Sequence, residues 1–424
     1  MDVQSIRADF PILARKIGGK LLVYLDNAAT AHKPRQVLHT IQEFYSKYNA
    51  NIHRSPHTLG MEATELYEQA HDNVARFIGA QDGREIVFVR NATEAINLVA
   101  HSLMDSANDR YCLRQGDEVL VTVMEHHSNL VPWQITSKLR GVTLRVADIR
   151  DDGTLDLQQV ADAIGRRTKL VCCTHVSNVL GTINSVREIG QLAHEAGALF
   201  LVDGAQSAPH MPVDVGAIGC DFFALSGHKM LAPMGIGALY ARREVLEEMS
   251  PFLYGGEMIA DVTLESATWN KLPWRFEAGT ANVCGGIALG GATDLRSGQR
   301  LEGAVDYLER LGMAAVRAHE KSLTIHALEG LGRIKGITVY GPLDPELRAG
   351  VVSFSVASGD AHLVAAFLND EGIAVRSGGH CAYPLAARLG VQGTVRVSFH
   401  VYNTVAEVDR FLEVLEDIVA AKLL

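Results

Sequence analysis

Short apolar runs alternate with stretches of helical periodicity between residues 85 and 240. Several gaps between the runs, such as 94–103 and 186–195, repeat apolar residues with the period of a helix. Strands separated by helices are typical of βαβ units, which build parallel sheets covered on both faces. The pattern therefore predicts a large α/β domain with a mostly parallel sheet. The expected strands fall at 86–89, 118–123, 143–146, 169–174, 198–202, 222–225 and 237–240.

The pattern of apolar and polar positions along the chain changes near residue 300. A long helical stretch at 301–328 is followed by mixed strands and helices, which suits a smaller α+β domain. We expect a large domain over residues 20–300 and a small domain built from residues 1–19 and 301–424. The expected elements of the small domain are strands at 338–340, 351–356, 374–376 and 395–399 and helices at 361–369 and 405–421.

The composition is that of an ordinary globular protein, with 47% hydrophobic and 21% charged residues among 424. Such a chain can bury a large core, so long disordered stretches are not expected. The 39 Lys and Arg residues against 49 Asp and Glu residues leave a net charge of -10. This balance argues against a nucleic-acid partner, although it leaves room for one small phosphate pocket.

Six cysteines occur, at positions 112, 172, 173, 220, 284 and 381, and none forms a C-x-x-C pair. They are too sparse for a disulfide framework. The amino terminus lacks the apolar core of a signal peptide, and no apolar run approaches the ~18 residues of a membrane span. We therefore expect a cytoplasmic protein with free thiols and no membrane association.

The residues with candidate catalytic roles are concentrated between positions 199 and 229. An apolar run places Asp203 at the carboxyl end of a strand, where ligands bind in open α/β sheets. The next apolar run is followed by Ser226, His228 and Lys229. A lysine just after a buried strand is desolvated, which lowers its pKa and makes it an amine nucleophile. A carboxylate at the neighbouring strand end is what a protonated pyridine nitrogen needs.

These residues belong to a set of motifs that extends almost from end to end of the chain. Its centre is Asp203-Gly-Ala-Gln206 followed by Ser226-Gly-His-Lys229. The other motifs are Leu25-Asp-Asn-Ala-Ala29, His53-Arg54, Asn91-Ala-Thr-Glu94, Met124-Glu-His-His127, Thr174-His-Val-Ser-Asn178, Arg275-Phe-Glu-Ala-Gly-Thr280 and Arg376-Ser-Gly-Gly-His-Cys-Ala382. With this set the chain resembles the SufS-like (group II) cysteine desulfurases, in the class V branch of fold-type-I pyridoxal-phosphate enzymes. The resemblance implies the PLP-dependent transferase fold type I, with a mostly parallel seven-stranded sheet in the large domain and a smaller α+β domain.

The resemblance assigns a cofactor and the residues that hold it. Lys229 would hold pyridoxal 5'-phosphate (PLP) as a Schiff base, and Asp203 would pair with the pyridinium nitrogen. Gln206 would contact the ring hydroxyl, and His126 would stack on the ring and move protons. Amides at the start of a helix near Glu94 would add to the phosphate site. The side chains expected at the phosphate are Thr93, Ser226 and His228.

The resemblance also implies how the substrate is bound and that the protein is a dimer. Arg396 would clamp the substrate carboxylate, a task suited to the planar fork of a guanidinium. Asn178 would contact cofactor or substrate, and Arg376 would either bind substrate or support its own loop. Thr280 would reach the phosphate of the other subunit, which implies a homodimer with composite active sites.

The presence of Cys381 distinguishes among the reactions that a PLP enzyme of this class could catalyse. Its surroundings, 376–382, are glycine-rich and polar, which predicts a mobile loop with an accessible thiol. Arg376 and an imidazolium at His380 would favour the thiolate, unless His380 only supports the loop. The implied reaction converts L-cysteine to L-alanine and leaves a persulfide on Cys381. The sulfur would then pass to a SufE- or SufU-type acceptor protein for iron–sulfur cluster assembly.

Three features depart from the family pattern. Ala92 stands where the family often has a second threonine, Gly379 stands where a bulkier residue is common, and the segment 104–113 is longer than usual. No metal is expected, because the His126-His127 pair lacks cysteine or carboxylate ligands at suitable spacing.

Other functions remain open at this point. They are a selenocysteine lyase, another class V lyase or transaminase that uses the same lysine, and a non-catalytic scaffold that binds a sulfur carrier. Retention of Cys381 disfavours a plain transaminase. The presence of Cys381 distinguishes a cysteine desulfurase from a selenocysteine lyase less well, since selenocysteine can react without a thiol nucleophile. A scaffold would be expected to have lost Lys229, Asp203 or Cys381, and all three are present.

Overall fold

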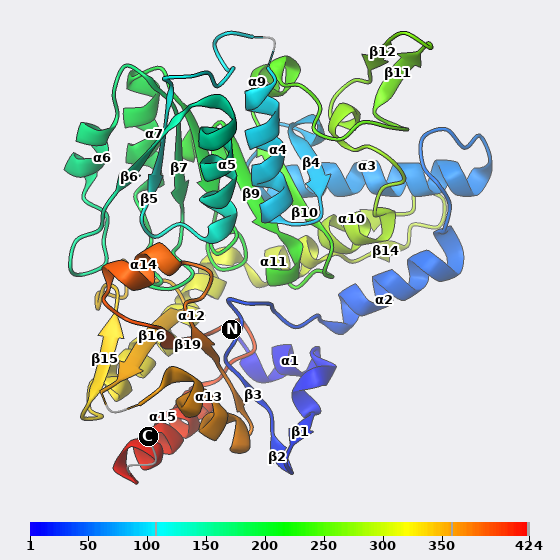
Figure 1. Ribbon diagram of the computed structural model, residues 1–424. Coiled ribbons are helices and arrows are strands. Elements are labelled where there is room, and N and C mark those ends of the chain that lie inside the picture. The colour runs from blue at the N-terminus through cyan, green and yellow to red at the C-terminus, as the bar shows by residue number, and fades with distance from the viewer. Residues whose placement is uncertain (107, 358, 422–424) are drawn as a thin grey trace.

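The computed structural model describes residues 1–106, 108–357 and 359–421. At its centre lies a seven-stranded sheet in the order β4-β10-β9-β8-β7-β5-β6 (Figure 1). Every pairing from β9 to β6 is parallel, and β10 runs antiparallel to both of its neighbours. All the predicted strands of the large domain are therefore confirmed. They are β4 (Ile86–Val89), β5 (Glu118–Thr122), β6 (Thr143–Ala147), β7 (Thr168–Thr174), β8 (Leu199–Asp203), β9 (Phe222–Ser226) and β10 (Gly237–Ala241).

Side chains of the central strands alternate between two apolar cores. In β8, Phe200 and Val202 pack into one core, whereas Leu199 and Leu201 pack into the other. Successive side chains of a strand point to opposite faces, so a strand covered on both faces is apolar throughout. The first core includes residues of α3 (Thr58–Ile78), α7 (Val186–Glu195) and α10 (Val283–Gly290), and the second includes residues of α4 (Ala92–Met104), α5 (Val131–Arg140) and α9 (Arg243–Glu248).

The C-terminal part forms a second unit around a four-stranded antiparallel sheet, in the order β15-β16-β19-β18. Its strands and helices share a third apolar core, which confirms the predicted α+β character. The N-terminal segment joins this unit, because β3 (Val23–Tyr24) pairs in parallel with β17 (Ile373–Ala374). The division of the chain at residues 20 and 300 stays a prediction. The elements are β15 (Ile337–Tyr340), β16 (Val351–Val356), β18 (Arg376–Gly378), β19 (Thr394–Ser398), α12 (Met313–Leu331), α13 (Ala361–Asp370) and α15 (Val405–Ala420).

Two predicted elements of this unit are divided in the structure. The helix expected at 301–328 is two helices, α11 (Ala304–Leu311) and α12, separated by Gly312 with a φ of +79°. A left-handed glycine interrupts the helical hydrogen bonds and lets the chain change direction. The strand expected at 374–376 is divided into β17 and β18, which pair with different neighbours.

The remaining elements are short and lie around the two units. They are α1 (Val3–Ala8), α2 (Arg35–Glu43), α6 (Leu157–Ala163), α8 (Val215–Ile218), α14 (Tyr383–Arg388), β1 (Lys16–Ile17), β2 (Lys20–Leu21), β11 (Ile259–Val262), β12 (Ala267–Trp269), β13 (Ala292–Thr293) and β14 (Arg300–Leu301). In Figure 1, α14 lies between the lower edge of the large sheet and the C-terminal unit. Among the described residues, no helix is both long and apolar enough to cross a bilayer. Residue 107 of the long segment 104–113 lies outside the described residues.

Candidate active site

A cavity of about 240 Å³ lies where the central strands end and the C-terminal unit meets them. In an open α/β sheet this edge, at the carboxyl ends of the parallel strands, is where ligands bind. Eleven of the twelve residues to which the sequence analysis gives a catalytic or binding role line this cavity, although they are spread over 304 positions of the chain. They are Thr93, His126, Asn178, Asp203, Gln206, Ser226, His228, Lys229, Arg376, Cys381 and Arg396.

Thr280 is the predicted residue that does not line this cavity. It lines a second cavity of about 410 Å³, together with Arg90 and Glu94. Glu94 lies in the first turn of α4, and Thr93 of the same turn faces the first cavity. Thr280 therefore lies beside the start of α4 but outside the active-site cavity of its own chain, and its predicted role stays a prediction.

Lys229 and Asp203 form the charged centre of the cavity. Asp203 ends β8, is 4% exposed, and accepts a hydrogen bond from the Ala205 N–H at 3.0 Å. Burial raises the pKa of Asp203, and the charge of Lys229 opposes that shift. Burial lowers the pKa of Lys229 to about 8 although Asp203 opposes the change. A substantial neutral fraction of the amine at mildly alkaline pH is what an imine-forming nucleophile requires.

The opposite end of the cavity is built to receive an anion. The start of α4, where Thr93 lines the cavity, brings the positive end of the helix dipole to this place. The Ala92 N–H donates to the Ser226 hydroxyl at 3.0 Å, so the hydroxyl proton of Ser226 remains free to be donated. Thr93 and His228 line the same cavity. Although Ala92 lacks the hydroxyl that is common at this position, its backbone fixes Ser226, and the residues fit a phosphate.

His126 faces the cavity as a neutral imidazole. Its Nδ1 accepts a hydrogen bond from the Ser128 N–H at 3.1 Å. Burial, assisted by the positive charge of Lys229, lowers the pKa of His126 to about 3. With Nδ1 occupied as an acceptor, the one proton of the neutral ring resides on Nε2. His126 can therefore donate a proton or a hydrogen bond from Nε2.

Gln206 has an unused acceptor in the cavity wall. Its Nε2 donates to the Ala28 carbonyl at 2.8 Å, whereas its buried Oε1 has no partner within the described residues. A buried polar atom without a partner is costly, so such an atom is expected to be satisfied by a ligand. A ring hydroxyl of the kind PLP carries would satisfy Oε1. The residues of the cavity thus fit PLP at its nitrogen, its hydroxyl and its phosphate.

Arg396 is held rigidly in the wall nearest to Cys381. The side chain is 2% exposed, donates from Nη1 to the Asn178 carbonyl at 2.9 Å and pairs through Nη2 with Asp26 at 3.2 Å. Its buried Nε has no partner in the described part of the chain. The Arg376 side chain is half-exposed and lies 3.9 Å from the other Asp26 oxygen. Asp26 was quoted among the sequence motifs, but its role as the counter-ion of Arg396 becomes visible only in the structure.

Cys381 is the exposed thiol of the chain. Cys172, Cys173, Cys220 and Cys284 are buried, and Cys112 is intermediate. The loop around Cys381 is less free than its composition suggests, because residues 376–378 form β18 and pair with β19. The accessible thiol is thus confirmed, whereas the mobility of the loop stays a prediction.

His380 does not act as an imidazolium beside the thiol. Its ring is buried and lies with Nε2 2.9 Å from the hydroxyl and 3.1 Å from the carbonyl oxygen of Thr394. Burial lowers the pKa of His380 to about 3, and the charge of Arg396 adds to the shift. The expectation of a cationic His380 is therefore wrong, because the ring is an anchor of the loop and stays neutral.

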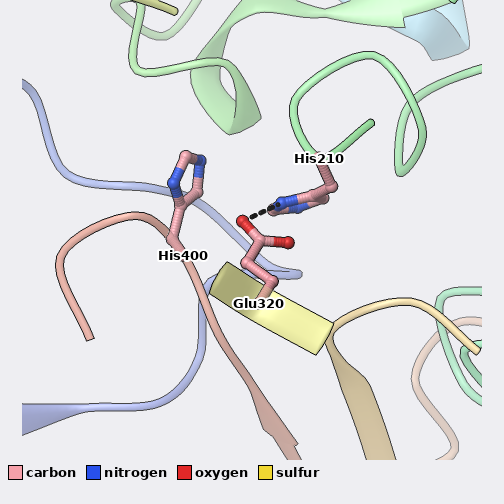
Figure 2. Close-up of side chains that lie close together, drawn as sticks. All are labelled: His210, Glu320 and His400. Atoms are coloured by element: carbon pink, nitrogen blue, oxygen red, sulfur yellow. Dashed lines mark hydrogen bonds and ion pairs between the residues drawn. The ribbon is translucent and has the colours of Figure 1, made fainter. Parts of the chain in front are cut away.

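A buried polar cluster lies next to the backbone of Lys229. Figure 2 shows Glu320 of α12 between the imidazoles of His210 and His400, with His210 Nδ1 2.9 Å from Glu320 Oε1. His400 Nε2 lies 3.3 Å from the Lys229 carbonyl, and His400 Nδ1 accepts the Val401 N–H at 2.8 Å. These side chains resemble a metal-ligand set, with donor atoms within 4.8 Å of one another. Both nitrogens of His400 are already engaged, so a metal ligand role is not favoured, and His400 alone of the three contacts the Lys229 backbone.

Comparisons with known proteins agree with this geometry. The Aminotransferase class-V family profile matches residues 23–411, so the chain belongs to that family. A cysteine desulfurase of Haloferax volcanii is 47% identical over 98% of this chain and 96% of its own length. The apo structure of a cysteine desulfurase from Thermococcus onnurineus NA1 is 42% identical, with a TM-score of 0.90 over 99% of this chain and 98% of that one. The cysteine desulfurase CsdA from Escherichia coli is 35% identical, with a TM-score of 0.87 and 99% of each chain covered.

Within the class V family the chain falls among the cysteine desulfurases. Its fold is that of the fold-type-I PLP enzymes, and its cofactor is pyridoxal 5'-phosphate. The resemblance stated from the sequence motifs is thereby confirmed.

The lowered pKa of Lys229 predicts how the protein takes up its cofactor. When apo-protein is mixed with PLP at a series of pH values, the rate of colour formation should rise with pH and reach half its maximum near pH 8. The reason is that only the neutral amine attacks the aldehyde. Lys229→Ala should stay colourless and the exposed Lys138→Ala should behave like wild type. A midpoint near 10.5, the ordinary lysine value, would contradict the proposed environment.

Arg396→Lys tests the role of the guanidinium. Lysine keeps the charge but loses the planar fork and the bond to the Asn178 carbonyl. We expect KM for L-cysteine to rise by about tenfold or more, the worth of a charge-assisted hydrogen bond, with a smaller change in kcat. The surface substitution Arg333→Lys is the control in the same steady-state assay. An unchanged KM would remove Arg396 from the substrate site.

Proposed function

We propose that this enzyme converts L-cysteine to L-alanine and keeps the sulfur as a persulfide on Cys381. The observation that carries the proposal is that the exposed thiol of Cys381 lines the same cavity as Lys229 and Arg396. Five other cysteines are buried or half-buried, so the thiol that substrate sulfur can reach is Cys381. A transaminase needs no such thiol, and a non-catalytic scaffold needs no desolvated lysine beside a buried aspartate.

Each side chain has a task that follows from its place in the cavity. Arg396 binds the substrate carboxylate with a donor that is free in the structure. Bound PLP supplies an electron sink at the substrate Cα. The amine of Lys229 would hold the cofactor, and it would also be placed to move protons at the substrate Cα. Asp203 holds the charge that favours a protonated cofactor nitrogen.

The sulfur transfer is a displacement at the substrate sulfur. The Cys381 thiolate attacks that atom, so a sulfur–sulfur bond forms while the carbon–sulfur bond breaks. The electron pair of the broken bond stays with the substrate carbon skeleton, which takes up protons and leaves as alanine. Lys229 and the Nε2–H of His126 are the proton donors that the cavity offers.

We infer that the enzyme works as a homodimer. Thr280 lies outside the cavity of its own chain but beside the start of α4, where the phosphate would bind. A second copy docked at this face would bring one chain's Thr280 to the other chain's site, as the family resemblance implies.

We further infer that the persulfide is handed to a SufE- or SufU-type acceptor for iron–sulfur cluster assembly. The exposure of Cys381 supports this, since a second protein can reach the thiol. Six free thiols suit a reducing compartment, and the cytoplasm is therefore the proposed location.

The decisive test compares wild type with Cys381→Ala on L-cysteine. Wild type should release alanine and sulfide in equal amounts with a reductant present, and it should carry an extra sulfur on Cys381 by peptide mass spectrometry. Cys381→Ala should keep the colour of the bound cofactor, because Lys229 and Asp203 are unchanged. It should lose at least about a hundredfold in turnover, the scale set by losing a nucleophile. Cys112→Ala is the matched control.

Two other results would revise the proposal. Normal desulfuration by Cys381→Ala would refute the persulfide on this residue. A much faster reaction with selenocysteine, independent of Cys381, would make the enzyme a selenocysteine lyase.

A further inference from the structure

The proposed nucleophile has an unusual backbone. His380 and Cys381 both have left-handed conformations, with φ values of 49° and 57°. Residues that carry a Cβ avoid this region, and two in succession are rarer still. Such a conformation persists where surrounding contacts determine it. The question is therefore which contacts hold Cys381 in this shape.

One side of the segment is held by residues already described. The Asn178 side-chain amide donates to the His380 carbonyl at 2.8 Å, and the His380 ring is anchored on Thr394. Within the loop, the Ala382 N–H donates to the Gly379 carbonyl at 2.9 Å. These contacts leave the Cys381 carbonyl and the Tyr383 N–H to be held from outside the loop.

His127 holds the other side at two points. Its backbone N–H donates to the Cys381 carbonyl at 2.8 Å, and its Nε2 accepts the Tyr383 N–H at 3.1 Å. The imidazole also meets the Tyr383 ring edge to face, with centroids 4.7 Å apart. Burial lowers the pKa of His127, which helps Nε2 remain an acceptor. A single residue of the large sheet domain thus contacts the chain on either side of the Cys381–Ala382 peptide.

Gly379 completes this arrangement from within the loop. A Cβ at this position would lie 2.5 Å from both Cδ1 and Cε1 of the Tyr383 ring, closer than real atoms approach. Gly379 does not have a left-handed φ, so its backbone would accept alanine and only the ring excludes it. The glycine where the family commonly has a bulkier residue is therefore matched to Tyr383, whose ring fills the space.

We propose that His127 is a positioning residue for Cys381, and that Gly379 and Tyr383 are a matched pair that lets His127 hold the thiol toward the cavity. His127 touches neither substrate nor the reacting atoms. The proposal rests on the proposed function of Cys381 as the persulfide carrier, and it assigns a role to the second histidine of the His126-His127 motif.

The first test removes the acceptor of the Tyr383 N–H and then replaces it. In holoenzyme, His127→Ala should lower kcat for desulfuration of L-cysteine by up to about tenfold, the worth of one hydrogen bond. KM should stay within about twofold, because Arg396 is untouched. His127→Gln can place its Oε1 near the position of Nε2 and should recover most of the activity. The exposed His39→Ala is the control.

The second test exploits the fit between Gly379 and Tyr383. Gly379→Ala alone should lower kcat by up to about tenfold, because the new methyl group pushes on the Tyr383 ring and so shifts the Tyr383 N–H away from His127. Adding Tyr383→Ala removes the obstacle, so the double variant should be more active than Gly379→Ala. Gly165→Ala, at a glycine with room for a Cβ, is the control.

The outcomes separate this proposal from the function on which it rests. Wild-type kcat in His127→Ala, equal losses in His127→Ala and His127→Gln, or a double variant worse than Gly379→Ala would each overturn the positioning role. Melting temperature and cofactor colour are measured for every variant, so a general loss of folding is visible and the glutamine rescue still decides the case. If Cys381→Ala desulfurates normally, the proposed function has failed instead, whatever the His127 variants do.

Discussion

The arrangement of the site depends on how four ionisable groups are buried without leaving a charge uncompensated. Lys229 is set against Asp203, and Arg396 is set against Asp26 at 3.2 Å. A buried ion without a partner is costly in a medium of low polarity, so each cation lies near a carboxylate. The charge of Asp203 offsets only part of the cost of burying Lys229, so burial still lowers the pKa of Lys229 to about 8. The same burial that costs stability therefore produces the reactive amine.

The histidines around these charges respond in the opposite way, by staying neutral. His126, His228 and His380 have pKa values lowered to between about 3 and 4, each chiefly by burial. A neutral ring has one donor and one acceptor, so the contact at one nitrogen fixes what the other nitrogen can do. In His126 an acceptor at Nδ1 leaves a donor at Nε2. The cavity thus holds several hydrogen-bonding rings without adding positive charge beside Lys229.

Much of the fold was predictable because the strands of the large sheet are covered on both faces. Apolar runs such as Leu199–Asp203 and Phe222–Ser226 need no tertiary information to be recognised. The boundary at Gly312 was missed because apolar periodicity continues across it, and only the left-handed glycine separates the helices. The division of the strand expected at 374–376 into β17 and Arg376–Gly378 is not visible in the sequence, because the polar, glycine-rich second part is paired only by its distant neighbour Thr394–Ser398.

The residues of the site that lie within short contiguous motifs, such as Lys229 and Cys381, could be predicted from the sequence. Asp26, His127 and His400 act through contacts with residues more than 150 positions away, so no local pattern assigns their roles.

A final constraint arises from the two-part architecture. Lys229 follows a strand of the large sheet, whereas the strand β18 that precedes Cys381 belongs to the sheet of the C-terminal unit, and Ala382 beyond it packs into the first apolar core. The relative position of the thiol and the lysine is then only as accurate as the contacts that cross between the units. Arg396 crosses to the Asn178 carbonyl, Asn178 crosses to His380, and His127 crosses to Cys381. Because displacement at sulfur needs an attack in line with the bond that breaks, these hydrogen bonds and the packing of Ala382 into the first core together set the position of the thiol.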